Sequence, residues 1–393
     1  MKLYLKGHNE RYPVEQLQMQ LFGDRPTQFV ETPFSGEDGA VSTLHDGRLY
    51  RTATAKITLN GKTASASRRI RLEQADVRMT RRILQQSYYL AAVQLLPETP
   101  PWGALSGVRP TKLTTKALLS GGSEKDAERM LRDVYFVTPE RRRLCLDASR
   151  HTLEAARLLE PNDLSVYIGI PFCPTRCAYC SFVSQSVEKS MKLIPPFMDA
   201  LIKEVSAVGA ELRALGLRVV SIYMGGGTPT TLNAAQLDRL CTALEREFDL
   251  GALREYTVEA GRPDTITEDK LRVLRAHGVD RVSVNPQTMS DSVLETIGRR
   301  HSSADIVDAL EKVRAVGGFA VNMDLIAGLP SDSADGFRET LDKVLALAPE
   351  NITVHTLSLK KGSRITLEGS PLPSPAEVSE MLDLAYDRLT AQG

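Results

Sequence analysis

Three cysteines within eight residues form the part of the chain best suited to chemistry. Cys173, Cys177 and Cys180 make a CxxxCxxC pattern directly after the apolar run at 166–170. Zinc fingers and ribbons usually need a fourth Cys or His nearby, and the next histidine is His277. Three soft ligands without a fourth favour an iron–sulfur cluster. In a four-iron cluster, one iron would then stay open to a small molecule.

A glycine-rich turn follows at 223–230, with the sequence YMGGGTPT. Its three consecutive glycines, Gly225, Gly226 and Gly227, let the backbone approach a ligand closely and present N–H groups to a carboxylate. A glycine run alone usually marks only a turn. Its place directly after an expected strand favours a ligand contact.

Polar residues also end the later expected strands. A single such residue is explained by a structural cap, because a buried polar group needs a partner. A ring of them around one opening indicates a bound polar molecule that carries an amine, a carboxylate and ribose hydroxyls. The members of this ring are Glu259, Asn285, Gln287, Arg299, His301, Asn322, Asp324 and His355.

Repeated strand and helix patterns position these residues. From Leu164 onward, apolar runs alternate with segments of helical spacing, which predicts a parallel sheet with helices outside. Six repeats are too few for a closed eight-stranded barrel and predict an open, partial (βα)6 barrel, with its site at the carboxyl ends of the strands. The expected strands are Ser165–Ile170, Val219–Tyr223, Tyr256–Glu259, Arg281–Val284, Phe319–Leu325 and Ile352–Leu357.

The chain before this barrel is expected to form two further parts. Residues 1–75 predict a small α/β unit, with a hairpin at Asn60-Gly61. The pattern over residues 76–163 predicts a helical segment and linker, and the pattern over residues 164–393 predicts the barrel. The loop 102–112 contains Arg109 and Lys112, which either bind an anionic group or belong to a packing loop.

Composition excludes several classes of protein. The 393 residues contain 49 basic and 49 acidic side chains, and this balance argues against a nucleic-acid partner because such binding normally needs a basic face. No apolar run is long enough for a membrane span or a signal peptide. Five cysteines, three of them clustered, favour a metal or redox site over disulfides. A cytoplasmic protein is therefore expected.

The motifs in this order resemble the radical S-adenosylmethionine (SAM) superfamily, and within it the oxygen-independent coproporphyrinogen III oxidase group. The resemblance rests on the cysteine loop, GGGTPT, Glu259, Gln287, the GRxH segment at 298–301 and the NxDLIxGLP segment at 322–330. It covers roughly residues 164–390. The GVRPTK loop at 107–112 resembles the HemZ-type coproporphyrinogen dehydrogenases.

The resemblance implies a 4Fe–4S cluster on the three cysteines and SAM on the open iron. Gly226, Gly227 and Thr228 would bind the methionine end of SAM. The other positions that match cofactor contacts of the family are Tyr167, Glu259, Gln287, Arg299 and Asp324. The implied reaction converts two propionates of coproporphyrinogen III to vinyl groups through a 5′-deoxyadenosyl radical, with a separate electron donor. The remaining propionates call for basic partners, for which the candidates are Lys360, Lys361, Arg364, Arg109 and Lys112.

Two departures keep other functions open. Phe182 stands where the oxidase group has a fourth cysteine, and the related haem chaperones also lack that cysteine. The chain ends at Gly393, where the family continues into a further domain, so a shortened chain is expected. The alternatives are a haem chaperone that keeps the cluster and SAM, or another radical reaction on a tetrapyrrole.

Overall fold

The computed structural model describes residues 1–23, 25–105, 109–182, 185–360 and 363–392. The chain divides into two compact units, Met1–Leu159 and Glu160–Gly393. Each unit has a hydrophobic core of its own, and each is described by itself.

The first unit is built on a five-stranded sheet with the order β2-β1-β3-β4-β5. β1 is parallel to β2 and β3, whereas β3, β4 and β5 are antiparallel. Asn60 and Gly61 both have positive φ in the β4–β5 turn, as a two-residue hairpin of this type requires, so the predicted hairpin is confirmed. The strands are β1 Lys2–Lys6, β2 Gln28–Val30, β3 Gly39–Asp46, β4 Tyr50–Leu59 and β5 Lys62–Arg71.

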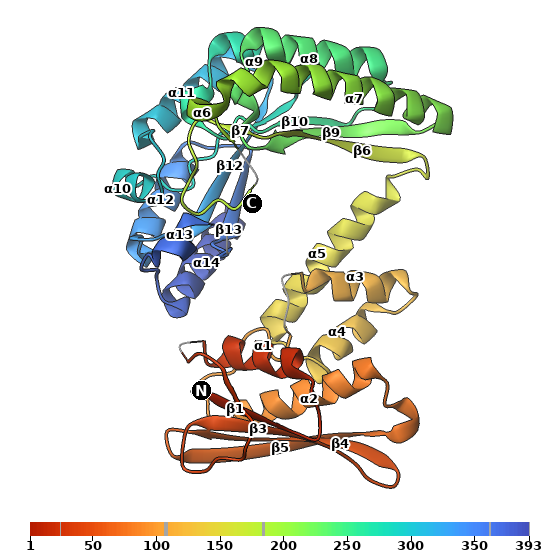
Figure 1. The fold of residues 1–393 in the computed structure, drawn as a ribbon. Helices are drawn as coiled ribbons and strands as arrows, with labels where there is room; N and C mark the ends of the chain where they lie inside the picture. The colour runs from red at the N-terminus through yellow and green to blue at the C-terminus, as the bar shows by residue number, and fades with distance from the viewer. Residues whose placement is uncertain (24, 106–108, 183–184, 361–362, 393) are drawn as a thin grey trace. The chain divides into compact units, whose positions relative to one another are not determined.

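Two helices, α1 (Arg11–Leu21) and α2 (Val77–Ala92), lie on one face of this sheet (Figure 1). Asp76 caps α2 by accepting from the backbone N–H of Met79. In the core, the Tyr88 hydroxyl donates to Gln18 Oε1 at 2.8 Å. The sheet and α2 share one core, so the boundary expected at residue 75 falls between a sheet and the helix that covers it.

Three more helices complete the first unit. They pack around a small separate cluster of Leu105, Leu131, Val137 and Cys145, which makes Cys145 a core residue. The three helices are α3 Thr111–Leu119, α4 Glu124–Asp133 and α5 Pro139–Arg157, and a 3-10 turn, η1 Leu72–Gln74, lies between β5 and α2.

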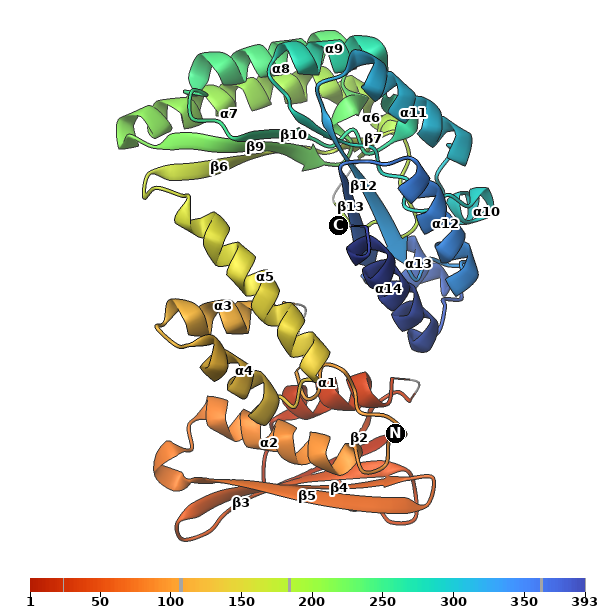
Figure 2. The ribbon, with the colours of Figure 1, turned by 180° about the vertical axis from the view of Figure 1, so that it is seen from behind.

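The second unit contains a six-stranded parallel sheet with the order β13-β12-β11-β10-β9-β6. Each strand lies beside the strand that precedes it along the chain, as in a barrel that has not closed. The helices cover the outer face of the curved sheet (Figures 1 and 2). The predicted fold class, a parallel α/β partial barrel, is confirmed. Its strands are β6 Asp163–Ile170, β9 Arg218–Gly226, β10 Glu255–Val258, β11 Arg281–Ser283, β12 Ala320–Ala327 and β13 Asn351–Thr356.

The long helices bury one face each against the sheet. Leu237, Leu240 and Leu244 of α8 recur at three- and four-residue steps and are fully buried. The helices are α7 Ile194–Leu215, α8 Ala234–Glu247, α9 Glu268–Ala276, α11 Ser303–Val316, α12 Ala334–Ala346 and α14 Pro375–Thr390. None of the helices among the described residues is long and apolar enough to cross a membrane.

Short elements lie between these strands and helices. A two-stranded ladder, Phe172–Cys173 (β7) with Gln185–Ser186 (β8), holds the ends of the cysteine loop together. The other short elements are α6 Val187–Ser190, η2 Met191–Leu193, η3 Pro229–Thr231, η4 Pro263–Thr265, α10 Asp291–Thr296 and α13 Arg364–Glu368.

Candidate cofactor site

One cavity of about 310 Å³ brings together residues that are far apart in the sequence. All three cysteines line it, together with Gly226, Gly227, Thr228, Glu259, Gln287, Arg299 and Asp324. Asn285, His355 and Phe182 are also in its wall. The strand ends and the cysteine loop therefore converge on a single space, as expected for a parallel sheet.

Tyr167 lies at the edge of this site. Its ring stacks on Tyr223, with centroids 6.0 Å apart, and it is 62% exposed. A Cβ built on Gly226 would lie 3.5 Å from the Tyr167 hydroxyl. Tyr167 is thus beside the glycine turn, although it does not line the cavity itself.

The glycine turn is bonded directly to the strand that leads into the cysteine loop. Gly227 N–H donates to the Ile170 carbonyl at 2.8 Å, and Thr228 N–H donates to the Phe172 carbonyl at 2.7 Å. A Cβ on Gly227 would lie only 2.5 Å from the Phe172 oxygen. Thr228 Oγ1 also donates to Cys173 Sγ at 3.7 Å. Glycine is needed at position 227 because the backbone of the turn lies too close to the Phe172 carbonyl to leave space for a Cβ.

Two buried arginines face the Cys177 thiol. Arg262 Nη1 is 3.7 Å from Cys177 Sγ, and Arg299 donates to the Tyr179 hydroxyl at 3.2 Å. Burial would raise the pKa of Cys177, but the positive charges of Arg299 and Arg262 outweigh burial and lower it. The thiolate, which is the form that binds a metal, is therefore favoured at Cys177.

Arg262 is a site residue that sequence reasoning missed. Its side chain is 3% exposed. It forms a bidentate ion pair with Asp264, with N···O distances of 3.0 and 3.1 Å, and donates to Thr175 Oγ1 at 3.1 Å. It follows Glu259 by three residues, at a strand end already singled out. A search for polar residues in the few positions after each expected strand would have found Arg262.

Two acids face the cavity from neighbouring parts of the sheet. Tyr223 donates to Glu259 Oε1 at 2.5 Å, and His355 Nε2 lies 3.7 Å from Asp324 Oδ2. Burial raises the pKa of Glu259, and the nearby Asp324 raises it further, although the Tyr223 bond opposes the shift. A cationic amine or hydroxyl donors bound beside Glu259 would favour its ionised form.

Gln287 is held in an unusual conformation. Its φ is +68°, a region that non-glycine residues rarely occupy. Its N–H donates to the Asp324 carbonyl at 2.9 Å, and its carbonyl accepts from Ile326 N–H at 3.0 Å. Such backbone strain gathers at functional sites, and here it directs a largely buried amide to the cavity wall.

The donor set fits an iron–sulfur cluster with a polar ligand. Three thiols share one cavity, and Arg299 Nε is buried with no hydrogen-bond partner among the described residues. The other guanidinium nitrogens of Arg299 donate to the Asn285 carbonyl and the Tyr179 hydroxyl, but a buried N–H without a partner is costly and suits a ligand carboxylate. In the described part of the chain, no three His, Cys, Asp or Glu side chains are grouped to hold a single metal ion.

Comparison with known proteins agrees with this geometry. The profile of the Radical SAM superfamily matches residues 167–344, which include every residue that lines the cavity except His355. Residues 167–344 therefore carry a radical SAM domain. Proteins of the superfamily use a 4Fe–4S cluster and SAM, so these are the cofactors of the radical SAM domain.

The relatives of this radical SAM chain include haem-related proteins. It is 40% identical over 290 residues to an oxygen-independent coproporphyrinogen-III oxidase-like protein HemZ of Bacillus subtilis, covering 72% of this chain and 58% of that protein. It is 32% identical over 243 residues to the haem chaperone HemW of Lactococcus lactis, covering 60% of each. The chain thus matches only about three fifths of these relatives' length.

A solved structure of an oxidase is also similar to this chain. Coproporphyrinogen III oxidase (HemN) from Escherichia coli superposes with a TM-score of 0.55 at 31% identity, covering 62% of this chain and 56% of that one. The chain is thus similar to proteins of the coproporphyrinogen oxidase group.

Proposed function

We propose that this protein converts coproporphyrinogen III to protoporphyrinogen IX by oxygen-independent oxidative decarboxylation. The supporting observation is the single cavity that joins three cysteines to Glu259, Gln287, Arg299 and Asp324, in a chain similar to HemZ-like and HemN proteins.

In this proposal, Cys173, Cys177 and Cys180 hold the cluster, and Gly226, Gly227 and Thr228 contact the methionine end of SAM. When bound, the two cofactors supply a one-electron cleavage of SAM that yields a hydrogen-abstracting radical. Arg299, whose Nε lacks a partner among the described residues, would bind a carboxylate of SAM. The remaining SAM contacts are Tyr167, Glu259, Gln287 and Asp324.

The protein's own residues position the substrate and exclude water. Each propionate, –CH₂–CH₂–COO⁻, loses one hydrogen atom, one electron and CO₂, and leaves a vinyl group. Two rounds give the product. Arg364 is a candidate partner for a substrate carboxylate, whereas Lys361 lies outside the described residues. The five cysteines are free of disulfides, and the proposal places the protein in the cytoplasm.

A haem chaperone is the second candidate function. Phe182 stands at the position of the fourth cysteine, lines the cavity and is 65% exposed. The similarity to HemW proteins supports this alternative. A large exposed aromatic side chain can pack against a flat macrocycle, which suits binding of haem as well as catalysis.

One anaerobic assay separates the two candidates. The reconstituted protein receives a reductant, SAM and coproporphyrinogen III, and mass spectrometry follows the tetrapyrrole. We expect two propionates to be replaced by two vinyl groups. Cleavage of SAM without decarboxylation, together with binding of one haem per chain, would reject the oxidase function and support the chaperone.

A further inference from the structure

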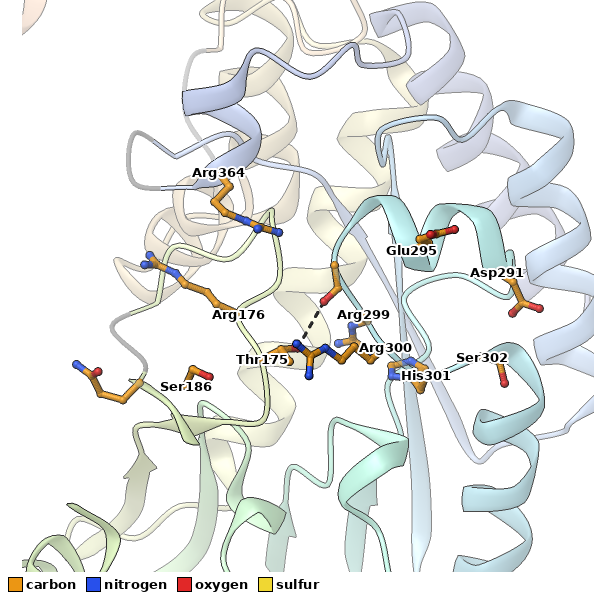
Figure 3. Close-up of a pocket in the computed structure, with 12 residues that line it drawn as sticks. Thr175, Arg176, Ser186, Asp291, Glu295, Arg299, Arg300, His301, Ser302 and Arg364 are labelled. Carbon is orange, nitrogen blue, oxygen red and sulfur yellow. Dashed lines mark hydrogen bonds between the residues drawn. The ribbon is translucent and has the colours of Figure 1, made fainter. Parts of the chain in front are cut away.

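A second, larger cavity lies beside the cysteine loop. Of the residues that line it, the proposed chemistry uses only Arg299, for SAM, and Arg364, as a candidate for a substrate carboxylate. Its volume is about 1090 Å³ (Figure 3). We call it the arginine groove, and its lining residues that carry the argument are Thr175, Arg176, Gly298, Arg299, Arg300 and Arg364.

Backbone hydrogen bonds join the three chain segments that carry the arginines of the groove. Ala178 N–H donates to the Ile297 carbonyl at 2.9 Å, and the Ala178 carbonyl accepts from Ile365 N–H at 3.1 Å. Gly298 leaves space for an arginine, because a Cβ there would lie 2.8 Å from Arg364 Nη2. The backbone segments that carry the arginines are therefore held against the loop that carries the cysteines.

The groove is directly connected to the cofactor site. Thr175, Arg176 and Arg299 line both cavities, and Arg176 is the neighbour of Cys177 in the chain. None of Glu259, Gln287 and Asp324 lines the groove. A molecule bound in the groove thus lies next to the cluster loop but does not face the acids expected to hold SAM.

The charges of the groove are arranged for an anionic partner. Arg176, Arg300 and Arg364 are all exposed and come from three different segments. The acids Asp291 and Glu295 lie on α10, away from Arg176 and Arg364 (Figure 3). Arginines therefore outnumber the two acids in the groove, and an excess of exposed positive charge steers an acidic protein surface and raises its association rate.

We propose that the arginine groove is the docking site of an acidic one-electron carrier protein that reduces the cluster. This inference rests on the proposed radical chemistry, which needs an electron for each turnover. The carrier loses one electron and the oxidised cluster gains it. Electron tunnelling weakens steeply with distance, so the carrier must dock close to the cysteine loop, where the groove lies.

The test measures cluster reduction and needs no tetrapyrrole. A reduced bacterial flavodoxin, an acidic one-electron carrier, is mixed with the reconstituted protein in a stopped-flow instrument, and the absorbance of the cluster is followed. The double variant Arg300→Gln/Arg364→Gln should lower the second-order rate constant about tenfold at low salt and flatten its salt dependence. Arg300→Gln alone should give a smaller decrease.

The matched control removes two exposed arginines elsewhere on the same unit. Arg272→Gln/Arg338→Gln, on α9 and α12, changes the net charge equally and should leave the rate unchanged. Photoreduced deazaflavin, a small uncharged reductant, should reduce the groove variant at the wild-type rate, which shows that its cluster is intact.

Two results would overturn the docking site. One is an unchanged flavodoxin rate and salt dependence in the groove variant. The other is a raised KM for coproporphyrinogen III with an unchanged carrier rate, which would assign the groove to substrate carboxylates. Failure of the decarboxylation assay alone leaves this test valid, because cluster reduction is measured without substrate.

Discussion

Arg262 shows how a single side chain can shape the chemistry of the site. It is buried against Cys177 and held by Asp264. Hydrogen bonds and charges near cluster sulfurs set the reduction potential of an iron–sulfur centre. A cation here stabilises the more negative, reduced cluster.

The substitution Arg262→Met should therefore lower the midpoint potential of the reconstituted cluster. We expect a shift on the order of 60 mV, which is a tenfold change for one electron. Arg262→Lys retains the charge and should shift the potential less. A redox titration followed by electron paramagnetic resonance measures both, and equal potentials in Arg262→Met and wild type would show that Arg262 has only a structural role.

His301 should make the stability of the cofactor-free protein depend on pH. Burial lowers the pKa of His301 to about 4, and the charges of Arg299 and Arg262 add to this effect. Between pH 6.5 and 4 the unfolded chain binds a proton that the folded chain does not. The free energy of unfolding should therefore fall as the pH decreases through this range, by on the order of 3 kcal/mol from this residue.

The comparison with His301→Gln isolates this contribution. Urea unfolding at several pH values should show a shallower decrease below pH 6.5 in the variant than in the wild type. Parallel pH profiles of the two proteins would contradict the assignment.

At the scale of elements, the junction of β9 with the start of the cysteine loop determines the geometry of the site. Gly227→Ala places a methyl group 2.5 Å from the Phe172 oxygen, so the backbones must separate. We expect a loss of roughly 2 kcal/mol in unfolding free energy and less iron bound per chain after reconstitution. Gly251→Ala, which meets only the Asp249 side chain at 3.2 Å, is the control.

Thermal unfolding and iron analysis measure the two effects of Gly227→Ala. A variant with wild-type stability and iron content would mean that the close approach at the glycine turn is not required.

The elements that sequence reasoning predicted well are those specified by local pattern. The strand expected at Val219–Tyr223 is β9, Arg218–Gly226, because its apolar run is bounded by clear loop signals. β3, Gly39–Asp46, was not predicted, since its small and polar residues become a strand only by pairing with β1 and β4.

The same distinction applies to the site. The cysteines, the glycine turn and Glu259 form local motifs or end local strands, so their types and positions were readable. The contacts of Arg262 with Cys177 and of Arg364 with Gly298 join segments that are far apart in the sequence. The sequence alone does not show such contacts, because they depend on how the whole sheet curves.

At the scale of the whole molecule, the chain consists of two units with separate cores. A segment with its own core can fold alone. We expect a fragment of residues 160–393 to bind iron and SAM with the same stoichiometry as the full chain, and a fragment of residues 1–159 to unfold cooperatively.

Circular dichroism, iron analysis and SAM titration of the two fragments test this expectation. If the 160–393 fragment unfolds or binds no iron while the full chain does, the first unit is needed to complete the second.

The central claim is that the three cysteines and the strand-end residues place SAM on an open iron. The most direct measurement is the electron paramagnetic resonance spectrum of the reduced, reconstituted protein before and after SAM is added. We predict a cluster signal that SAM changes in the wild type and that is absent in Cys177→Ala. A cluster signal that SAM leaves unaltered, or one that persists in Cys177→Ala, would contradict it.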